Sequence, residues 1–402
     1  MKKHFVLALV LFCAVNGMTQ DPSFWRGPSQ NGNYPDKGLL KEWPEAGPEL
    51  LWHFDEAGKG YSAPTVYNGR IYLTGTPEDT GYVFVLDLNG KLIKKYPYGK
   101  EFVESYPGSR TSPTLVGDLL YVSSSLGHLY CLKAESGEPV WHHDLLGGFD
   151  GPQIKWGVTE TVLVDGDLVF CTPGGKKNNV MALNRFTGKV VWTSPGLGEE
   201  SAYCSPLIVN LPSRKLLVTH TASHILGMDA GTGKVLWSHH QPNRYSVHAN
   251  TPLYHDGSLF CFSGYGHGGV MLKLNEDGSS VTKEWFQQKY DSRMGGAVYH
   301  NGHIYGSGDN NRFWMCLDWK TGEVKWESTG LAVGVVILAD GMLYGYSQRG
   351  ELVLIKADPS SYQLKGNTKI TLGSDQHWAH LVMHEGTLLV RHGQVLMAYK
   401  VK

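Results

Sequence analysis

A β-hairpin that recurs along the chain is the feature that most restricts its fold. The stretch 313–326, FWMCLDWKTGEVKW, has two runs of strand-forming residues around a turn that contains Gly322, which can adopt a positive φ. Similar hairpins occur at 132–141 (LKAESGEPVW), 183–192 (LNRFTGKVVW), 228–237 (MDAGTGKVLW) and, less regularly, 274–285 (LNEDGSSVTKEW). Because one hairpin cannot bury its own apolar face, a recurring hairpin predicts a repeat architecture.

A second marker, a tight turn, recurs with a similar period. It occurs as Asn68-Gly69, Gly117-Asp118, Asp165-Gly166, Asp256-Gly257, Asn301-Gly302, Asp340-Gly341 and Glu385-Gly386, and Pro212-Ser213-Arg214 fills the gap in the series. Successive turns are separated by roughly 39 to 49 residues, which is the spacing of four-stranded propeller blades. Eight turns predict eight units, each with an inner strand, the turn, a second strand, a third strand and an outer strand.

The two ends of the chain are expected to share one blade. The last unit, 380–401, ends after three strands, whereas an isolated strand at 49–54 precedes the first unit and carries Trp52 where other units have their outer-strand Trp. This strand would complete the last blade and close the ring, which removes the exposed sheet edges of an open array. We therefore predict an all-β chain in which residues 21–48 form an extended lead-in and residues 49–402 form a single eight-bladed β-propeller of four-stranded antiparallel blades. A solenoid, the alternative repeat architecture, would not need the N-terminal strand.

The N-terminus has the pattern of a secretory signal peptide. Residues 1–20 contain two lysines, then an apolar core at 5–15 that is too short for a membrane span, then small and polar residues. We expect cleavage between Gly17 and Gln20, and hence a periplasmic or extracellular protein without a transmembrane segment. Lipidation at Cys13 is the alternative, which is disfavoured because Phe12 is bulky where a lipidation site has a small residue.

Composition narrows the kinds of partner. The net charge is −1 and the chain has no basic or acidic block, which argues against nucleic acid. We expect a monomer that binds a small molecule or a protein partner. The remaining cysteines form no CxxC pair and lie in predicted strands, so we expect buried small side chains, with one disulfide as the alternative and no zinc or redox site. They are Cys131, Cys171, Cys204, Cys261 and Cys316.

The hairpins, with the pattern LD-x-x-TGK/E-x-x-W, and the opening motif FWRGP at 24–28 resemble the pyrroloquinoline quinone (PQQ) repeat family of quinoprotein alcohol dehydrogenase-like β-propellers. The resemblance covers essentially the whole mature chain, with the best matches in units two, three, four and six. It implies the propeller fold and says little about function. The family includes quinoprotein dehydrogenases and also the non-enzymatic propeller of the outer-membrane protein assembly machinery.

The residues of the hairpin motif are expected to be structural. The tryptophans should pack between neighbouring blades and bury a large aromatic surface. They are Trp141, Trp192, Trp237 and Trp326, and the glycines that should make the accompanying turns are Gly137, Gly188, Gly233 and Gly322. The most regular motif of the chain therefore predicts its fold and not its chemistry.

Candidate ligand-binding residues are expected where the chain enters each inner strand, because the inner strands line the central channel of a propeller. These segments are polar and aromatic, and convergent polar groups over aromatic walls suit a small ligand. The candidates are Arg110, Trp156, Glu160, His248, Asn250, Asp291, Arg293, His377 and Trp378. The alternative is a water-filled channel plugged by side chains, and no residue supports a catalytic assignment.

The resemblance implies a more specific site. Dehydrogenases of the family hold Ca²⁺ beside PQQ with a Glu, an Asn and an Asp from inner-strand ends, and stack the quinone on a Trp. Glu160, Asn250 and Asp291 have these identities in this order and would be the metal ligands, since oxygen ligands suit Ca²⁺. Trp156 or Trp378 would stack on the quinone. The adjacent-cysteine disulfide of these enzymes has no counterpart here, and the chain is much shorter than theirs.

Three functional hypotheses follow. The first is a ligand-binding or protein-interaction scaffold that uses its central funnel and rim loops. The second is a PQQ- and Ca²⁺-dependent oxidoreductase that acts on alcohols or sugars. The third is an accessory factor in envelope protein assembly, which would use exposed blade edges and rim loops. The sequence favours the first hypothesis.

Overall fold

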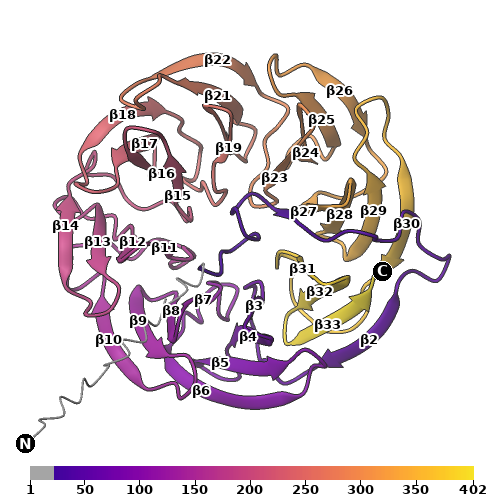
Figure 1. The fold of residues 1–402 in the computed structure, drawn as a ribbon, viewed down its shortest axis with the longest axis horizontal. Helices are drawn as coiled ribbons and strands as arrows, with labels where there is room; N and C mark the ends of the chain where they lie inside the picture. Colours follow the sequence, from indigo (N-terminus) through magenta and orange to yellow (C-terminus); the bar gives the residue numbers. More distant parts are fainter. Residues whose placement is uncertain (1–21) are drawn as a thin grey trace, which may run out of the picture.

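A computed structural model describes residues 22–402, and the predicted signal peptide, with Cys13, lies outside this range. The regular elements of the described residues are all β-strands, which form eight sheets arranged in a ring around a central axis (Figure 1). Between residues 22 and 402 there is no helix with the length and hydropathy that crossing a membrane requires. The predicted eight-bladed β-propeller is confirmed.

The first four blades follow one another around the ring in chain order. Blade 1 consists of β3 (Thr65–Tyr67), β4 (Arg70–Gly75), β5 (Thr80–Asp87) and β6 (Leu92–Lys100). Blade 2 consists of β7 (Thr114–Val116), β8 (Leu119–Ser123), β9 (His128–Lys133) and β10 (Pro139–Asp144). Blade 3 consists of β11 (Leu163–Asp165), β12 (Leu168–Cys171), β13 (Val180–Asn184) and β14 (Val190–Ser194). Blade 4 consists of β15 (Leu207–Asn210), β16 (Lys215–His220), β17 (His224–Asp229) and β18 (Val235–His240).

The other four blades complete the ring. Blade 5 consists of β19 (Leu253–His255), β20 (Ser258–Ser263), β21 (Gly268–Leu274) and β22 (Val281–Gln287). Blade 6 consists of β23 (Ala297–His300), β24 (His303–Ser307), β25 (Trp314–Asp318) and β26 (Val324–Ser328). Blade 7 consists of β27 (Gly334–Ala339), β28 (Met342–Ser347), β29 (Glu351–Lys356) and β30 (Leu364–Lys369). Blade 8 consists of β31 (Val382–His384), β32 (Thr387–His392), β33 (Val395–Lys400) and β2 (Glu49–Phe54).

Short turns fix the register of each blade. Asn301 and Gly302 connect β23 to β24 with φ of +46° and +82°, and positive φ at both central residues is the mark of a type I′ hairpin turn. In the outer hairpin of the same blade, Asp318 Oδ1 accepts hydrogen bonds from the backbone N–H groups of Lys320 and Thr321, both at 2.9 Å. The recurring sequence motif is therefore a turn held by its own side chain.

The outer-strand tryptophans lie between neighbouring blades, as predicted. Each indole Nε1 donates a hydrogen bond to a backbone carbonyl in the loop between the third and outer strands of the next blade. The pairs are Trp141 with Arg185 (2.9 Å), Trp192 with Ala230 (3.0 Å), Trp237 with Gly278 (3.2 Å) and Trp326 with Asp358 (2.8 Å). A Cβ placed on Gly233 would lie 2.4 Å from the Trp192 ring, so this turn has room for the indole only because it carries glycine.

Blades 1 and 8 make the same inter-blade hydrogen bond with residues that the sequence motif does not identify. In blade 1 a tyrosine replaces the tryptophan: Tyr96 Oη donates to the carbonyl of Ala134 at 3.1 Å. In blade 8 the contact comes from β2, where Trp52 Nε1 donates to the carbonyl of Leu88 in blade 1 at 3.1 Å. The N-terminal strand therefore supplies the last inter-blade wedge as well as the last strand.

Strand β2 closes the ring by antiparallel pairing with β33, in a register that places Glu49 opposite Lys400 and Phe54 opposite Leu396. In Figure 1 the indigo β2 runs alongside the yellow β33, although the two strands come from opposite ends of the sequence. The predicted closure is confirmed. The outer strand of blade 8 is thus paired rather than left as an open position in the ring.

Arg391 joins the two blades that meet at this closure. Its side chain is fully buried in β32 and donates hydrogen bonds to the carbonyls of Gly393 (2.9 Å), Thr74 (2.7 Å) and Ser62 (3.3 Å), and to Ser62 Oγ (2.5 Å). No carboxylate of the described residues bonds to this guanidinium, so blade 1 holds it through carbonyl and hydroxyl oxygens. Burial lowers the pKa of Arg391 to about 9.

Replacing Trp237 with Ala is expected to lower the free energy of unfolding by about 3 kcal/mol, because it removes a buried ring and leaves a cavity between blades 4 and 5. Denaturant unfolding followed by far-UV circular dichroism measures the loss. Phe186→Ala is the control, since Phe186 lies exposed in a surface turn. Equal unfolding midpoints for the two variants would contradict the wedge role.

The lead-in crosses the centre of the ring before it reaches β2 (Figure 1). It was expected to be extended without regular elements, but it contains the short strand β1 (Asn33–Tyr34), which pairs in parallel with β27 at Leu338 and Ala339. Upstream of β1, Arg26 is buried and donates hydrogen bonds to His380 Nδ1 (3.0 Å) and to the carbonyl of Ala297 (2.7 Å). These contacts fix the lead-in across the central channel.

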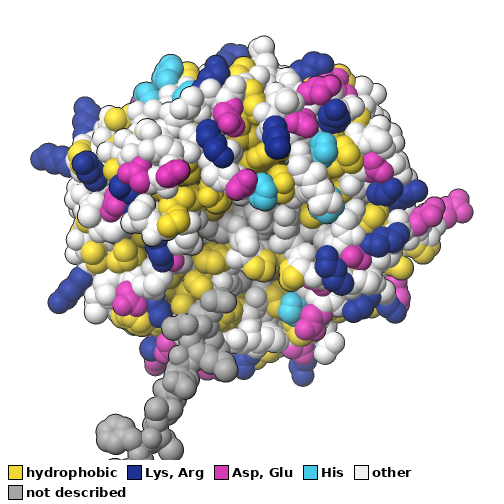
Figure 2. Space-filling model, turned by 45° about the horizontal axis from the view of Figure 1, so that its top comes forward, with side chains coloured by type: hydrophobic (Ala, Val, Ile, Leu, Met, Phe, Trp, Pro, Cys, Tyr) yellow, Lys and Arg dark blue, Asp and Glu magenta, His cyan; other side chains and the backbone are white. Residues whose placement is uncertain are grey.

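The cysteines of the described residues are all buried and none of them is paired, which confirms the prediction of buried small side chains. Figure 2 shows basic and acidic side chains interspersed over the visible face, in keeping with a net charge of −1. Neither the cysteines nor the charge pattern of this face marks a site.

Candidate functional site

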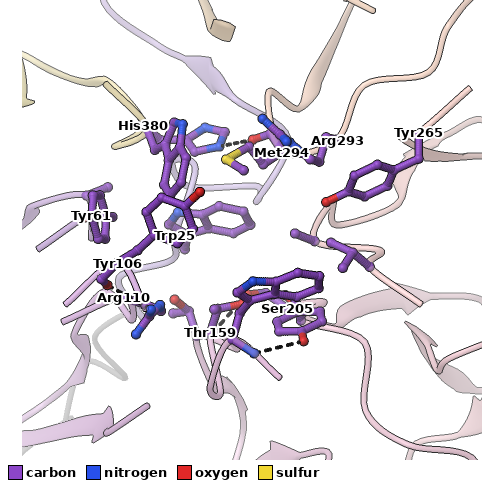
Figure 3. A pocket seen from close by; sticks show the side chains of 17 residues that line it. Trp25, Tyr61, Tyr106, Arg110, Thr159, Ser205, Tyr265, Arg293, Met294 and His380 are labelled. Atoms are coloured by element: carbon purple, nitrogen blue, oxygen red, sulfur yellow. Dashed lines mark hydrogen bonds between the residues drawn. The ribbon is translucent and has the colours of Figure 1, made fainter. Parts of the chain in front are cut away.

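A cavity of about 260 Å³ lies in the centre of the ring, at the mouth formed by the segments that enter the inner strands (Figure 3). We call it the funnel cavity. It is lined by Trp25, Tyr61, Ala63, Tyr106, Arg110, Trp156, Thr159, Thr161, Tyr203, Ser205, Val247, Ala249, Tyr265, Arg293, Met294, Trp378 and His380. Seven of these residues are Trp or Tyr, two are Arg, and none is Asp or Glu.

The propeller geometry explains why residues from so many blades meet here. The segments that precede β3, β7, β11, β15, β19, β23 and β31 all end at the same mouth of the channel. Trp25 comes instead from the lead-in, and it lines both the funnel cavity and a second cavity formed largely by residues 22–36. The lead-in thus provides a floor that separates the two cavities.

Two groups of aromatic rings form part of the cavity wall. In one group Trp378 contacts Tyr61 and Tyr106, with ring centroids 5.2 and 4.7 Å apart. In the other group Trp156 contacts Tyr203, with ring centroids 6.1 Å apart, and Tyr265 adds its ring further along the wall. Aromatic walls of this kind offer flat apolar faces to a ring-shaped ligand.

The two arginines supply the positive charge of the cavity. Arg110 donates hydrogen bonds to the carbonyls of Ser105 (2.6 Å) and Tyr106 (2.9 Å), and burial lowers its pKa. Arg293 lies with its guanidinium 5.7 Å from the centre of the Tyr265 ring, and its buried Nε finds no hydrogen-bond partner within residues 22–402. Its nearest acidic contact is Asp309, at 3.9 Å and outside the cavity lining. Arginine stays protonated at neutral pH, so the cavity carries two cations.

Four of the nine predicted candidates line this cavity: Arg110, Trp156, Arg293 and Trp378. The structure therefore brings together two arginines and two tryptophans that the sequence placed 46 or more positions apart. The other five candidates lie elsewhere around the channel. They are Glu160, His248, Asn250, Asp291 and His377.

The three residues that would hold Ca²⁺ do not fit a metal site. Backbone groups hold the Asn250 amide: its Nδ2 donates to the carbonyls of Ser292 (2.7 Å) and Arg293 (3.2 Å), and its Oδ1 accepts from Gly296 N–H (3.0 Å). These bonds position the loop before β23. The amide therefore already has a structural role in this loop.

The carboxylate of Asp291 is committed in a similar way. It accepts hydrogen bonds from the backbone N–H groups of Gly266 (3.0 Å), Asp309 (2.7 Å) and Asn310 (2.8 Å), and so ties two rim loops together. Its pKa is nevertheless raised, because burial outweighs these bonds. In the part of the chain that the structure describes, no three His, Cys, Asp or Glu side chains are grouped to hold a metal ion.

Glu160 is buried on its own. Its Oε2 accepts a hydrogen bond from Thr172 N–H at 3.0 Å, and its Oε1 has no partner among the described residues. Burial raises the pKa of Glu160 to about 8, so the carboxyl group is protonated at neutral pH. A neutral carboxylic acid is a poor ligand for Ca²⁺, and the residues implied by the resemblance therefore do not form the expected calcium site.

Replacing Glu160 with Gln is expected to flatten the alkaline side of the stability profile. The folded pKa of about 8 lies above the ordinary value of 4.5, so the stability contributed by the neutral acid is complete below pH 4.5 and is lost as the pH rises through 8. At pH 9 the Gln variant should melt roughly 3 °C above the wild type. Thermal unfolding at pH 6 and pH 9 tests this, and an equal pH dependence in both proteins would refute it.

The two candidate histidines pack against other histidines. His248 stacks on His220, with ring centroids 5.0 Å apart, and burial lowers the pKa of His248 to about 4. His377 stacks on His392 at 3.8 Å and bonds to Tyr346 Oη, and its pKa is lowered to about 4, mainly by burial. Both are neutral packing groups beside the channel rather than residues of the funnel cavity.

His380 lines the cavity but is not free to act as a base. Its Nδ1 accepts a hydrogen bond from Arg26, and its Nε2 donates to the carbonyl of Met294 at 2.9 Å. Burial lowers its pKa to about 3. With both nitrogens engaged and the ring neutral, His380 serves to position Arg26 and the lead-in.

Several lining residues were not predicted as site residues. Tyr61 and Tyr203 lie in the segments that enter the inner strands, so their sequence positions could have identified them as lining residues. Tyr106 and Tyr265 project from longer loops, and Trp25 comes from the lead-in, so only the assembled fold brings them to the cavity.

Comparison with known proteins places the chain in a family. The family described as outer membrane protein assembly factor BamB matches residues 100–328, more than half of the chain. The tetrathionate hydrolase of Acidithiobacillus ferrooxidans is 24% identical over 230 residues, which are 54% of this chain and 44% of that protein. The outer membrane protein assembly factor BamB of Kangiella koreensis is 24% identical over 212 residues, which are 52% of this chain and 50% of that protein.

The matches thus span about half the length of these relatives. Among solved structures, a europium-containing methanol dehydrogenase superposes with a TM-score of 0.67 at 12% identity, over 90% of this chain and 88% of that chain. At this identity the likeness shows the fold alone. The fold, the recurring hairpins and the match over residues 100–328 together show that the chain belongs to the PQQ-like β-propeller family.

Proposed function

We propose that this protein is an exported binding propeller whose funnel cavity holds a small molecule with a ring-shaped body. One observation carries the proposal: a central cavity of about 260 Å³ is lined by seven Trp or Tyr residues and two Arg residues drawn from most of the blades. Pockets that combine aromatic walls with a few placed polar groups are typical of small-ligand sites. Export is supported by the signal-peptide pattern of residues 1–20 and by relatives named for the outer membrane.

The residues that line the cavity support a binding role better than they support the activity of a quinone-dependent oxidoreductase. The residues that the resemblance assigns to Ca²⁺ are used elsewhere: Asn250 and Asp291 hold loops, and Glu160 is a buried neutral acid. Within the described lining, the only histidine, His380, has both nitrogens engaged. The lining is therefore suited to holding and orienting a molecule.

Thermal shift and intrinsic Trp fluorescence test the proposal with the purified protein. The probes are a panel of soluble two-ring aromatic compounds and oligosaccharides, neutral and charged. We expect saturable binding that raises the melting temperature and changes the Trp emission. The Trp378→Ala substitution should weaken this binding about tenfold, because it removes a stacking face. Phe186→Ala is the control. Absence of any saturable binder, or binding unchanged by Trp378→Ala, would overturn the proposal.

A second candidate function, docking of a protein partner in the manner suggested by the relatives named BamB, is favoured by the outer strands. Leu50 and Leu51 on β2 and Val190 and Val191 on β14 leave between 40% and 51% of their surface exposed at the rim of the ring. Cross-linking in cell envelopes tests this role. Loss of the cross-linked species in a Leu51→Asp, Val191→Asp variant would support it, and its persistence would refute it.

A further inference from the structure

The charge pattern of the funnel cavity says more about the ligand than its aromatic walls do. Among the described residues, the lining includes the cations Arg110 and Arg293, no carboxylate, and one histidine, His380, whose two ring nitrogens are both engaged. Figure 3 shows the two arginines on opposite sides of Trp25, which forms the floor between them. The cavity therefore presents two separated positive groups around a flat apolar surface.

Among the described residues Arg110 has no ion pair, and the ion pair of Arg293 is a long one. The hydrogen bonds of Arg110 go to the carbonyls of Ser105, Tyr106 and, at 3.5 Å, Gly108, which orient it without cancelling its charge. Arg293 lies 3.9 Å from Asp309, too far for a hydrogen bond, and its buried Nε is unpartnered among residues 22–402. A buried donor without a partner costs free energy, and an acidic group of a ligand would remove that cost.

From this arrangement we infer that the ligand is an organic dianion: a ring-shaped body that lies over Trp25, with one acidic group toward Arg110 and a second toward Arg293. The inference rests on the proposed binding function and adds the class of ligand. Arginine matches carboxylate, sulfonate and phosphate groups with paired N–H donors, so any of these acids suits the two ends. The body can be a fused aromatic ring system or a pair of sugar rings, since both offer a flat face to the walls formed by Trp378 and Trp156.

Recognition of this dianion needs no metal ion. The two arginines supply the positive charge, and the residues expected to hold Ca²⁺ lie outside the cavity lining with their polar atoms committed or neutral. Binding should therefore be the same in the presence of a chelator. It should weaken with added salt, because the attraction between the arginines and the acidic groups is partly screened.

Isothermal titration with matched probes tests the inference. The aromatic arm uses naphthalene-2,6-dicarboxylate, 2-naphthoate and 2,6-naphthalenedimethanol, which carry two, one and no acidic groups on the same ring body. The sugar arm uses digalacturonate and its neutral counterpart galactobiose. We expect the dianion of at least one arm to bind at least tenfold tighter than its neutral counterpart, and the tighter arm identifies the body of the ligand.

Variants assign the two ends. Arg110→Gln and Arg293→Gln are each expected to lower the affinity for the dianion about tenfold, and to lower the affinity for the neutral probe by less than twofold. Arg349→Gln, at an exposed turn of blade 7, is the control and should leave both affinities unchanged. Circular dichroism confirms that each variant is folded before titration.

The outcomes separate this inference from the proposed function. Equal affinity for charged and neutral probes, or unchanged affinity in both Gln variants, would overturn the dianion while leaving the cavity as a ligand site. Failure of all five probes to bind, together with an empty result from the broader panel, would overturn both. Binding that disappears on adding a chelator would also contradict the inference, since it would place a metal ion where the arginines are proposed to act.

Discussion

Lowering the pH from 5.5 toward 4.5 is expected to destabilise the propeller by about 3 kcal/mol per pH unit, because three buried histidines cost about 4 kcal/mol per unit and the buried acid Glu160 offsets about 1 of them. Three buried histidines produce this effect: burial lowers the pKa of His220 well below its ordinary value, that of His248 to about 4 and that of His380 to about 3. Each is neutral in the folded protein and takes up a proton on unfolding below pH 6.5. Their stability contribution is therefore complete above pH 6.5 and is lost as the pH falls.

The surroundings of these rings do not stabilise a positive charge on the imidazole. His220 and His248 stack on each other, and neither nitrogen of His220 has a hydrogen-bond partner within the described chain. His380 faces the cation Arg26. Protonation would therefore bring like charges together in the interior, at a cost that unfolding removes.

Urea unfolding at pH 7.5, 6.5, 5.5 and 4.5, followed by Trp fluorescence, measures the acid effect. A His248→Gln variant should show a shallower dependence on pH, by about 1.4 kcal/mol per pH unit, whatever its stability at pH 7.5. His53→Gln is the control, because the His53 side chain on β2 leaves 44% of its surface exposed. Equal stability of the wild type at pH 7.5 and 5.5 would contradict the buried neutral histidines.

Replacing Arg391 with Met is expected to lower the free energy of unfolding by about 3–5 kcal/mol. Methionine keeps the apolar stem of the side chain, but the carbonyls of Thr74, Ser62 and Gly393 lose their donor in a buried position. Arg391→Lys should recover only part of the loss, because an ammonium group cannot reach all of these oxygens at once. Unfolding in guanidinium chloride measures both variants.

The control for this series is Arg349→Met, an exposed arginine of blade 7 whose replacement should change stability by less than about 0.5 kcal/mol. Because Arg391 connects the last blade to the first, limited proteolysis adds a second measurement. We expect early cleavage in the Met variant between β2 and β3. If cleavage begins instead at loops between central blades, Arg391 does not hold the closure.

The fold was predictable because its information is local and repeated. Every regular blade carries the same turn and the same wedge, so the pattern around Gly322 and Trp326 identified blade 6 and, by comparison, the others. Ring closure could be predicted by counting strands, since the last unit lacked one strand and an unassigned strand preceded the first unit. The sequence did not show that Tyr96 replaces the inter-blade tryptophan in blade 1. Only the hydrogen bond from its Oη to the carbonyl of Ala134 shows that it makes the same contact.

The site was predictable only in part, because it depends on distances between blades. The order of Glu160, Asn250 and Asp291 matched a metal-binding pattern, but order does not reveal that Asn250 and Asp291 bond to backbone groups or that burial keeps Glu160 protonated. Arg110 and Arg293 were found because they precede inner strands. That the two arginines line one cavity together with Trp25 could be seen only in the assembled ring.

The pairing of β2 with β33 also sets the order of events when the chain is made. Glu49 emerges from the ribosome 351 residues before its partner Lys400, so the seam forms only after the strands of all eight blades have been translated. Contacts between residues so distant in sequence are slow to form, and until then β2 exposes Leu50, Leu51 and an unpaired backbone edge. A chain that stops before β33 keeps that edge open to proteases. The seam can therefore close only in a chain that includes β33.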